Sequence, residues 1–230
     1  RLVFIDRPMR HDEAYTFIAF ASQPFRVVIS DYHLPNNHVF HTILVYLSYH
    51  LFGNQPGFIR LPALIAGILL VPGIYWLGIR IYERNAALLA AALVAVSPTL
   101  IDFSTNARGY TLISLLTLLI LGLGIAIREN LNRPAWIGVV ILTALGFYTV
   151  PTMLYPFGVL VVWLVLSSLF SDISPEYGRG FWKTLILACL AVGLLTLFLY
   201  ATIGLVSGFD SITSNSTVAP LDWEDLWSSL

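Results

Sequence analysis

The chain has 230 residues, of which 57% are hydrophobic and only 11% are charged, and its mean hydropathy is +0.80. Because soluble domains carry about 25% charged residues, this composition excludes an ordinary soluble domain and indicates a protein of the lipid bilayer. The net charge of -1 excludes the strongly basic surface with which proteins bind nucleic acid.

The polar part of the chain is residues 1–60, which hold all five histidines. Residues 12–22 predict a short helix on the membrane surface, because Asp12 and Glu13 suit the dipole of its first turn and apolar side chains follow. Residues 38–52 predict a mostly apolar helix that, at ~1.5 Å per residue, is too short for a ~30 Å hydrocarbon core. We therefore interpret this helix as interfacial or re-entrant, and residues 1–60 as a loop that faces water.

Six transmembrane helices are predicted between residues 61 and 209, in five uncharged stretches. The stretches are 61–79, 86–101, 109–127, 134–171 and 184–209. The fourth stretch is too long for one helix, and Pro151 and Pro156 are expected to divide it in two. Residues 210–230 are interpreted as the start of a further loop on the same side as residues 1–60, and we expect the chain to be part of a longer membrane protein.

The loops between these helices indicate how the chain is oriented in the membrane. One set of loops holds four acidic residues and six basic ones, which are Arg80, Arg84, Arg128, Arg133, Arg179 and Lys183. Short basic loops face the cytoplasm, so residues 1–60, Asp102 and Arg108 are predicted to lie on the extracytoplasmic side. A membrane-crossing helix at residues 38–52 would turn the basic loops outward, which is why we interpret that helix as interfacial.

Two kinds of charged residue suggest chemistry at this outer boundary. The carboxylates of Asp12 and Glu13 can act as a general base toward a hydroxyl group or hold a divalent metal ion, and a purely structural pair at a helix start is the alternative. Arg60 and Arg108 each stand at the outer end of an apolar helix, where two guanidinium groups can clamp a lipid phosphate or merely fix the helix at the interface. Asp102 is expected to pair with Arg108.

Two histidines, His38 and His41, lie three residues apart on the predicted interfacial helix. This spacing is typical of metal ligands on one helix face, but the sequence contains no His-Glu-x-x-His signature. We therefore favour hydrogen bonding at the interface, or contact with a phosphate group, over metal binding.

Six short motifs follow one another between residues 7 and 128. They are His-Asp-Glu-Ala-Tyr at 11–15, Pro-Asn-Asn-His at 35–38, Phe-Gly at 52–53, Arg-Leu-Pro-Ala-Leu at 60–64, Ser-Pro at 97–98 and Ala-Arg-Gly-Tyr at 107–110. Their order resembles the dolichyl-phosphate-mannose protein mannosyltransferase-like proteins of the GT-C superfamily of membrane glycosyltransferases, which also contains the lipid A aminoarabinose transferases. The resemblance implies an all-α, polytopic bundle of transmembrane helices whose first extracytoplasmic loop carries the acidic pair.

The resemblance also implies roles for particular residues. Asp12 is expected to be the base that acts on the acceptor hydroxyl, with Glu13 supporting it or positioning the acceptor. Arg60, together with His38 and Arg108, is expected to bind the phosphate of the sugar donor. Supporting roles are expected for Tyr15, Asn37, His41 and Asp102.

The predicted function is an inverting glycosyltransferase that moves a sugar from a polyprenyl-phosphate donor to a hydroxyl group of a protein, lipid or glycan. The sequence identifies no definite cofactor, and a divalent metal ion is the alternative. We expect an integral protein of a bacterial plasma membrane, or of the endoplasmic reticulum in a eukaryote, with its site on the extracytoplasmic side. A lipid or polyprenyl-phosphate transporter and a non-catalytic membrane subunit are the alternatives, although charged residues at helix ends favour the enzyme over the transporter.

Overall fold

The computed structural model describes residues 1–34, 36–130, 133–170 and 175–208, and over these residues the secondary structure is entirely helical. The all-α prediction is therefore confirmed. Residues 210–230, the predicted start of a further loop, lie outside the described residues. The helices are η1 (Leu2–Phe4), α1 (His11–Thr16), η2 (Phe17–Ala21), α2 (Phe25–Ser30), α3 (Val39–Phe52), α4 (Pro56–Ile59), α5 (Leu61–Ile81), α6 (Arg84–Val96), α7 (Pro98–Ser104), α8 (Tyr110–Asn130), α9 (Arg133–Thr149), η3 (Pro151–Met153), α10 (Leu154–Leu169) and α11 (Pro175–Val206).

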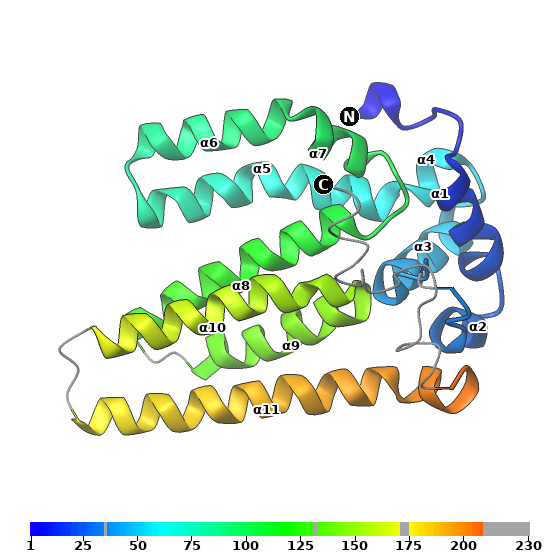
Figure 1. Cartoon of the computed structure of the whole chain (residues 1–230). Coiled ribbons are helices and arrows are strands. Elements are labelled where there is room, and N and C mark those ends of the chain that lie inside the picture. The colour runs from blue at the N-terminus through cyan, green and yellow to red at the C-terminus, as the bar shows by residue number, and fades with distance from the viewer. Residues whose placement is uncertain (35, 131–132, 171–174, 209–230) are drawn as a thin grey trace, which may run out of the picture.

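The long helices α5, α6 and α8–α11 form an elongated bundle (Figure 1). Among the described residues, four segments are long and apolar enough to cross a membrane, and α6 with α7, bent by 59°, can be a fifth. The four are Leu61–Ile81, Tyr110–Glu129, Pro151–Leu169 and Gly180–Val206. The remaining predicted span, which is the first half of the 134–171 stretch, corresponds to α9, which has only 17 residues. At ~1.5 Å per residue it is shorter than a ~30 Å hydrocarbon core.

Proline and glycine residues set several helix boundaries. Pro98 begins α7 directly after Ser97, whose hydroxyl group accepts a hydrogen bond from the Leu100 amide at 3.4 Å. Pro151 begins η3 and separates α9 from α10, so the predicted break in the long uncharged stretch is confirmed. Gly53 ends α3 with a φ of 101°, a left-handed conformation that glycine adopts without strain.

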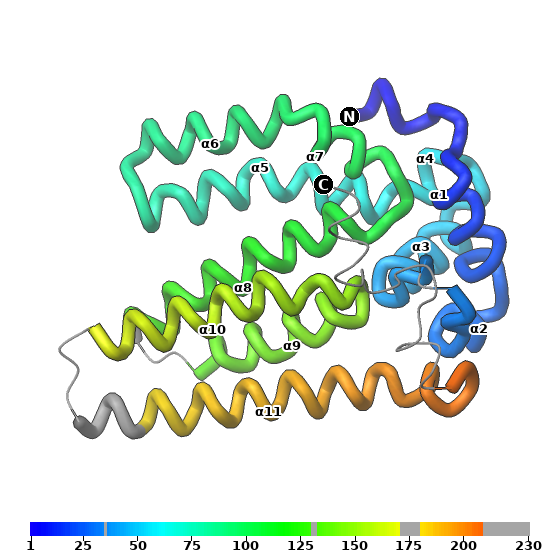
Figure 2. The backbone as a smooth tube through the Cα atoms, in the orientation of Figure 1, coloured from blue at the N-terminus to red at the C-terminus, as the bar shows by residue number. Residues whose placement is uncertain are grey.

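The short N-terminal helices gather at one end of the bundle (Figure 1). The tube in Figure 2 shows α1–α4 at this end, next to the start of α5 and the loop between α7 and α8. α3 contacts both α5 and α9 there. The α5–α6 turn lies at the opposite end with the start of α9, where two of the predicted basic loops are (Figure 1). Residues 1–60 therefore lie at the end of the bundle away from the basic loops.

Close packing of α7 on α5 brings the loop after α7 toward α1. Ser104, in the last turn of α7, occupies the space where a side chain of Gly67 would lie. The Ser104 hydroxyl group also accepts a hydrogen bond from Arg1 Nε at 3.0 Å. Because a larger residue at position 67 would push α7 away, this glycine helps to place Ala107 and Arg108 beside α1.

The end of α11 fixes the segment between α2 and α3. Thr202 Oγ1 donates to the Ile29 carbonyl at 2.8 Å, and Ser207 Oγ donates to the Ser30 carbonyl at 2.8 Å. The Tyr32 amide in turn donates to Ser207 Oγ at 3.1 Å. These contacts hold the residues before α3 against a long helix, which gives the neighbouring polar side chains a rigid support.

Candidate active site

The centre of the polar end is a buried ion pair between Glu13 of α1 and Arg60 at the start of α5. Arg60 Nε donates to Glu13 Oε1 at 2.6 Å and Arg60 Nη2 donates to Oε2 at 2.7 Å, which makes a bidentate ion pair between two planar groups. The Ala107 amide adds a hydrogen bond to Oε1 at 2.8 Å. Glu13, one of the two acidic residues singled out in the sequence, therefore contacts Arg60 directly.

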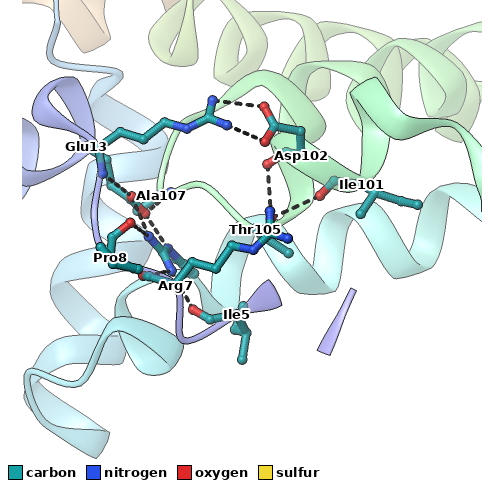
Figure 3. A network of polar contacts seen from close by, with 10 residues as sticks. Ile5, Arg7, Pro8, Glu13, Ile101, Asp102, Thr105 and Ala107 are labelled. Carbon is teal, nitrogen blue, oxygen red and sulfur yellow. Dashed lines mark hydrogen bonds and ion pairs between the residues drawn. The ribbon is translucent and has the colours of Figure 1, made fainter. Parts of the chain in front are cut away.

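The other N–H groups of Arg60 hold the N-terminal segment. Its Nη1 donates to the carbonyls of Ile5 at 2.5 Å and Arg7 at 2.7 Å, and its Nη2 also donates to the Pro8 carbonyl at 3.3 Å. Figure 3 shows these carbonyls and the Glu13 carboxylate gathered in one network. Arg60 is only 2% exposed, and all three of its guanidinium nitrogens already donate within the chain. Arg60 was expected to bind the phosphate of the sugar donor. In the structure its N–H groups instead hold α1 and the N-terminal segment in place.

Asp12 is the solvent-exposed member of the acidic pair. Its side chain is 48% exposed, whereas that of Glu13 is fully buried. Its Oδ2 lies 3.8 Å from Arg108 Nη1, close enough for an ion pair but too far for a direct hydrogen bond. Adjacent residues of a helix point about 100° apart, so one carboxylate faces the interior while its neighbour faces the open side.

Arg108 is a buried cation beside Asp12, and part of its hydrogen-bonding capacity is unused. It is 5% exposed, and its Nη1 donates to Asn36 Oδ1 and to Thr16 Oγ1, the latter at 3.3 Å. Its Nε has no hydrogen-bond partner among the described residues. Its Nη2 lies 3.2 Å from His38 Nε2.

The tautomer of His38 follows from a second contact. The Gly109 amide donates to His38 Nδ1 at 2.9 Å, so Nδ1 carries the lone pair and the hydrogen of the neutral ring is on Nε2. Burial and the nearby charge of Arg108 lower the pKa of His38 well below its usual 6.5, which keeps the ring neutral. Both His38 Nε2 and Arg108 Nη2 therefore present an N–H group, and an acceptor atom placed near both would satisfy them together.

Asn36 joins α1 to Arg108 and was missed by sequence reasoning. Its Nδ2 donates to the Asp12 carbonyl at 3.1 Å and to Thr16 Oγ1 at 3.2 Å, while its Oδ1 accepts from Arg108. The predicted residue was its neighbour Asn37, whose amide donates to the carbonyls of Val28 at 3.2 Å and Asp31 at 2.9 Å. Asn37 thus braces α2, and only the register of the turn distinguishes the two.

The predicted pairing of Asp102 with Arg108 is wrong. Asp102 accepts two hydrogen bonds from Arg10, from Nη2 at 2.5 Å and from Nη1 at 2.9 Å (Figure 3). This ion pair is exposed and ties the start of α1 to α7. Arg108 reaches across to α1 instead, because its side chain leaves the loop after α7 on the side of Asp12 and Asn36.

The remaining supporting residues occupy two different surroundings. His41 is fully buried, neither ring nitrogen has a hydrogen-bond partner in the part of the chain that the structure describes, and burial followed by the charge of Arg108 lowers its pKa to about 3. Tyr15 Oη lies 2.9 Å from His33 Nε2 on the exposed side of α1. Over the described ranges, no three His, Cys, Asp or Glu side chains converge as metal ligands would.

Residues 39–179 match the family model of the dolichyl-phosphate-mannose-protein mannosyltransferases. The chain belongs to this family. Neither a search of curated proteins nor a search of solved structures gave a significant match. Membership in the family and the apolar helices together make the chain an integral membrane protein of the glycosyltransferase class.

The matched region of this mannosyltransferase family contains only part of the polar cluster. Arg60, His41 and Arg108 lie within residues 39–179, whereas α1 with Asp12 and Glu13 precedes them. The contacts of Arg108 with Asp12 and of Arg60 with Glu13 therefore join α1 to the matched region. Chemically, the cluster combines an open carboxylate with a neutral imidazole and a guanidinium group whose N–H groups are partly unused.

Proposed function

We propose that the chain is an inverting glycosyltransferase that moves a sugar from a polyprenyl-phosphate donor to an acceptor hydroxyl on the extracytoplasmic side of the membrane. One observation carries this proposal: the half-exposed Asp12 carboxylate lies 3.8 Å from Arg108, whose Nη2 meets the N–H group of His38 without an acceptor between them. Such a site offers a base for a hydroxyl group next to N–H groups for a phosphate.

We propose that the reaction is a direct displacement. Asp12 accepts the proton of the acceptor hydroxyl while the hydroxyl oxygen attacks the anomeric carbon of the donor sugar. The bond between that carbon and the phosphate oxygen breaks, and its electrons leave with the phosphate. Arg108 and His38 donate hydrogen bonds to this oxygen as its negative charge grows, which stabilises the transition state more than the bound sugar donor. Attack from the face opposite the phosphate inverts the configuration of the sugar.

The Glu13–Arg60 pair supports this chemistry without touching the substrate. It joins α1 to the start of α5 and, through the Ala107 amide, to the residue before Arg108. Asp12 and Arg108 are therefore held by the same buried contact. Reacting groups must be held within a fraction of an ångström of their productive geometry, and this arrangement supplies such a constraint.

An apolar hollow near the polar end suits the lipid tail of the sugar donor. It has a volume of about 340 Å³ and lies between α3, α5 and α8. Its wall includes Leu44, Leu51, Phe52, Ile65, Leu112 and Leu115. Leu61 lines the hollow and directly follows Arg60 in the chain. The hollow therefore begins at the start of α5, where Arg60 binds α1. An isoprenoid chain would bury its apolar surface there while its phosphate stays at the polar end.

The charge distribution supports the extracytoplasmic side. Arg80 and Arg84 flank the turn between α5 and α6, and Arg128 and Arg133 flank the connection between α8 and α9 at the same end of the bundle. Since short basic loops stay in the cytoplasm, the opposite end with Asp12 would face outward. A transporter would need charged groups along its path through the membrane, which the helix-end positions of these residues disfavour.

The test is sugar transfer in proteoliposomes that contain the full chain and a labelled polyprenyl-phosphate sugar. Asp12→Asn keeps the shape of the side chain but removes the base, and we expect it to lower the transfer rate at least 100-fold, as the roughly 10²–10⁴-fold contribution of general bases predicts. Glu83→Gln is the matched control, because Glu83 is an exposed carboxylate at the opposite end of the bundle. Full transfer by Asp12→Asn would refute the proposal, and movement of the intact lipid between leaflets without transfer would favour the transporter.

A further inference from the structure

Three polar side chains, linked in a row by hydrogen bonds, lie beside the proposed base and have no part in the mechanism so far. Asp31 Oδ1 lies 2.6 Å from His33 Nδ1, and His33 Nε2 lies 2.9 Å from the hydroxyl oxygen of Tyr15. The His33 amide also donates to Asp31 Oδ1, at 3.1 Å. The order of groups is therefore carboxylate, imidazole and phenol.

In the neutral form of the His33 ring, the carboxylate end sets the direction of both hydrogen bonds between these three side chains. Asp31 Oδ1 can only accept, so His33 Nδ1 donates to it and the lone pair of the neutral ring is on Nε2. The Tyr15 hydroxyl group then donates its hydrogen to Nε2. As a result the lone pairs of the Tyr15 oxygen remain for another partner, which must be a hydrogen-bond donor.

Neighbouring residues hold these three side chains in place next to Asp12. Tyr15 follows Asp12 by three residues in α1, so both side chains leave the same face of the helix. The buried ring of Phe20 contacts both aromatic groups, at 6.4 Å from Tyr15 and 5.3 Å from His33 between ring centres. The Asp31 carbonyl accepts from Asn37, and Ser207 of the α11 end accepts from the next amide, that of Tyr32.

We propose that Tyr15 binds a hydroxyl group of the substrate by accepting its hydrogen bond, and that His33 and Asp31 are positioning residues that fix the Tyr15 hydroxyl group for this task. The inference rests on the proposed function, because it places that hydroxyl group within one helical turn of the base. The group is a ring hydroxyl of the donor sugar or a hydroxyl of the acceptor. Both have the chemistry that the Tyr15 oxygen requires.

The first experiment compares wild type with Tyr15→Phe in the proteoliposome assay. Removing the hydroxyl oxygen loses one hydrogen bond, so KM for one substrate should rise roughly 3- to 10-fold, with a much smaller change in kcat. A rise in KM for the polyprenyl-phosphate sugar would assign the contact to the donor sugar. A rise in KM for the acceptor would assign it to the acceptor.

The second experiment tests the positioning role of His33. His33→Gln can still offer an oxygen to the Tyr15 hydroxyl group and should keep KM near the wild-type value, whereas His33→Leu cannot and should raise it as Tyr15→Phe does. The double variant Tyr15→Phe with His33→Leu should be no worse than Tyr15→Phe alone, since both changes act through the same oxygen. Equal loss in His33→Gln and His33→Leu, or additive losses in the double variant, would overturn the positioning role.

The outcome separates this inference from the proposed function. If Asp12→Asn abolishes transfer but Tyr15→Phe leaves both KM values unchanged, the Tyr15 contact is refuted and the base remains. A lower thermal stability of Tyr15→Phe with unchanged KM values would likewise refute it, by showing that the hydrogen bond only holds the fold. If Asp12→Asn transfers sugar at the full rate, the proposed function itself is refuted.

Discussion

Arg108 Nη2 and His38 Nε2 lie 3.2 Å apart, and each of the two nitrogens carries a hydrogen. Two facing N–H groups repel weakly and leave their hydrogen-bonding capacity unused in a buried place. Arg108 Nε adds a third N–H group that lacks a partner in the described parts of the chain. An oxygen atom with negative charge would relieve this arrangement, and the phosphate of a lipid-linked sugar has such oxygens.

Replacement of Arg108 should therefore weaken transfer strongly. We expect Arg108→Ala to lower kcat roughly 100- to 1,000-fold, because it removes a buried cation from the place where charge develops on the leaving phosphate. Arg108→Lys should recover only part of the loss, since an ammonium group cannot contact Asn36, His38 and a phosphate in the planar geometry of a guanidinium group. The measurement is the rate of transfer from a labelled polyprenyl-phosphate sugar at saturating acceptor.

The matched control for this prediction is Arg84→Ala. Arg84 is an exposed arginine at the basic end of the bundle, so its loss should leave kcat within about twofold of wild type, as is usual for surface substitutions. Equal effects of the two replacements would show that general charge loss, and not contact with the phosphate, accounts for the result at Arg108.

Glu13 should matter for folding as well as for activity. Glu13→Gln leaves the buried guanidinium group of Arg60 without its opposite charge, and breaking one partner of a buried ion pair costs about 3–5 kcal/mol of unfolding free energy. Asp12→Asn should cost far less, because its carboxylate is half-exposed. Thermal unfolding of the two variants in the same detergent compares these effects directly. A Glu13→Gln protein as stable as Asp12→Asn would argue against a structural pair.

The positions of the long helices were predictable from the sequence, because an uncharged run of about 20 residues has few alternatives to a helix in lipid. The break at Pro151 was predictable for the same kind of reason, since proline interrupts the helical hydrogen-bond ladder. The charge of the loops placed residues 1–60 on one side of the membrane, and Glu13 and Arg60 meet at that end of the bundle. These predictions depend on local chemistry and on membrane orientation alone.

The partner of each charged side chain was not predictable, because it depends on tertiary register. Asp12 and Glu13 are adjacent, and the rotation of α1 decides that Glu13 faces Arg60 while Asp12 faces Arg108. Asp102 is near Arg108 in the sequence but pairs with Arg10. Sequence distance favours local pairs, whereas the fold brings together side chains from α1, α5 and the loop after α7.

Buried histidines should make the folded protein sensitive to mild acid. The pKa of His41 is lowered to about 3 by burial and by the charge of Arg108, and that of His38 is lowered well below 6.5 by burial, Arg108 and His41. Between pH 6.5 and about 3 the unfolded chain therefore binds protons that folded His41 does not, so the stability falls as the pH falls through this window. Each such histidine can cost up to about 1.4 kcal/mol per pH unit.

His41→Leu isolates this effect, because neither nitrogen of His41 has a hydrogen-bond partner within the described residues. The variant should be about as stable as wild type at pH 7 and should lose less stability between pH 7 and pH 5, by roughly 2 kcal/mol. Thermal unfolding at the two pH values provides the comparison, with His50→Leu as the control, since His50 is exposed on the same helix. If wild type and His41→Leu lost equal stability on acidification, the buried imidazole of His41 would not be the source of the acid sensitivity.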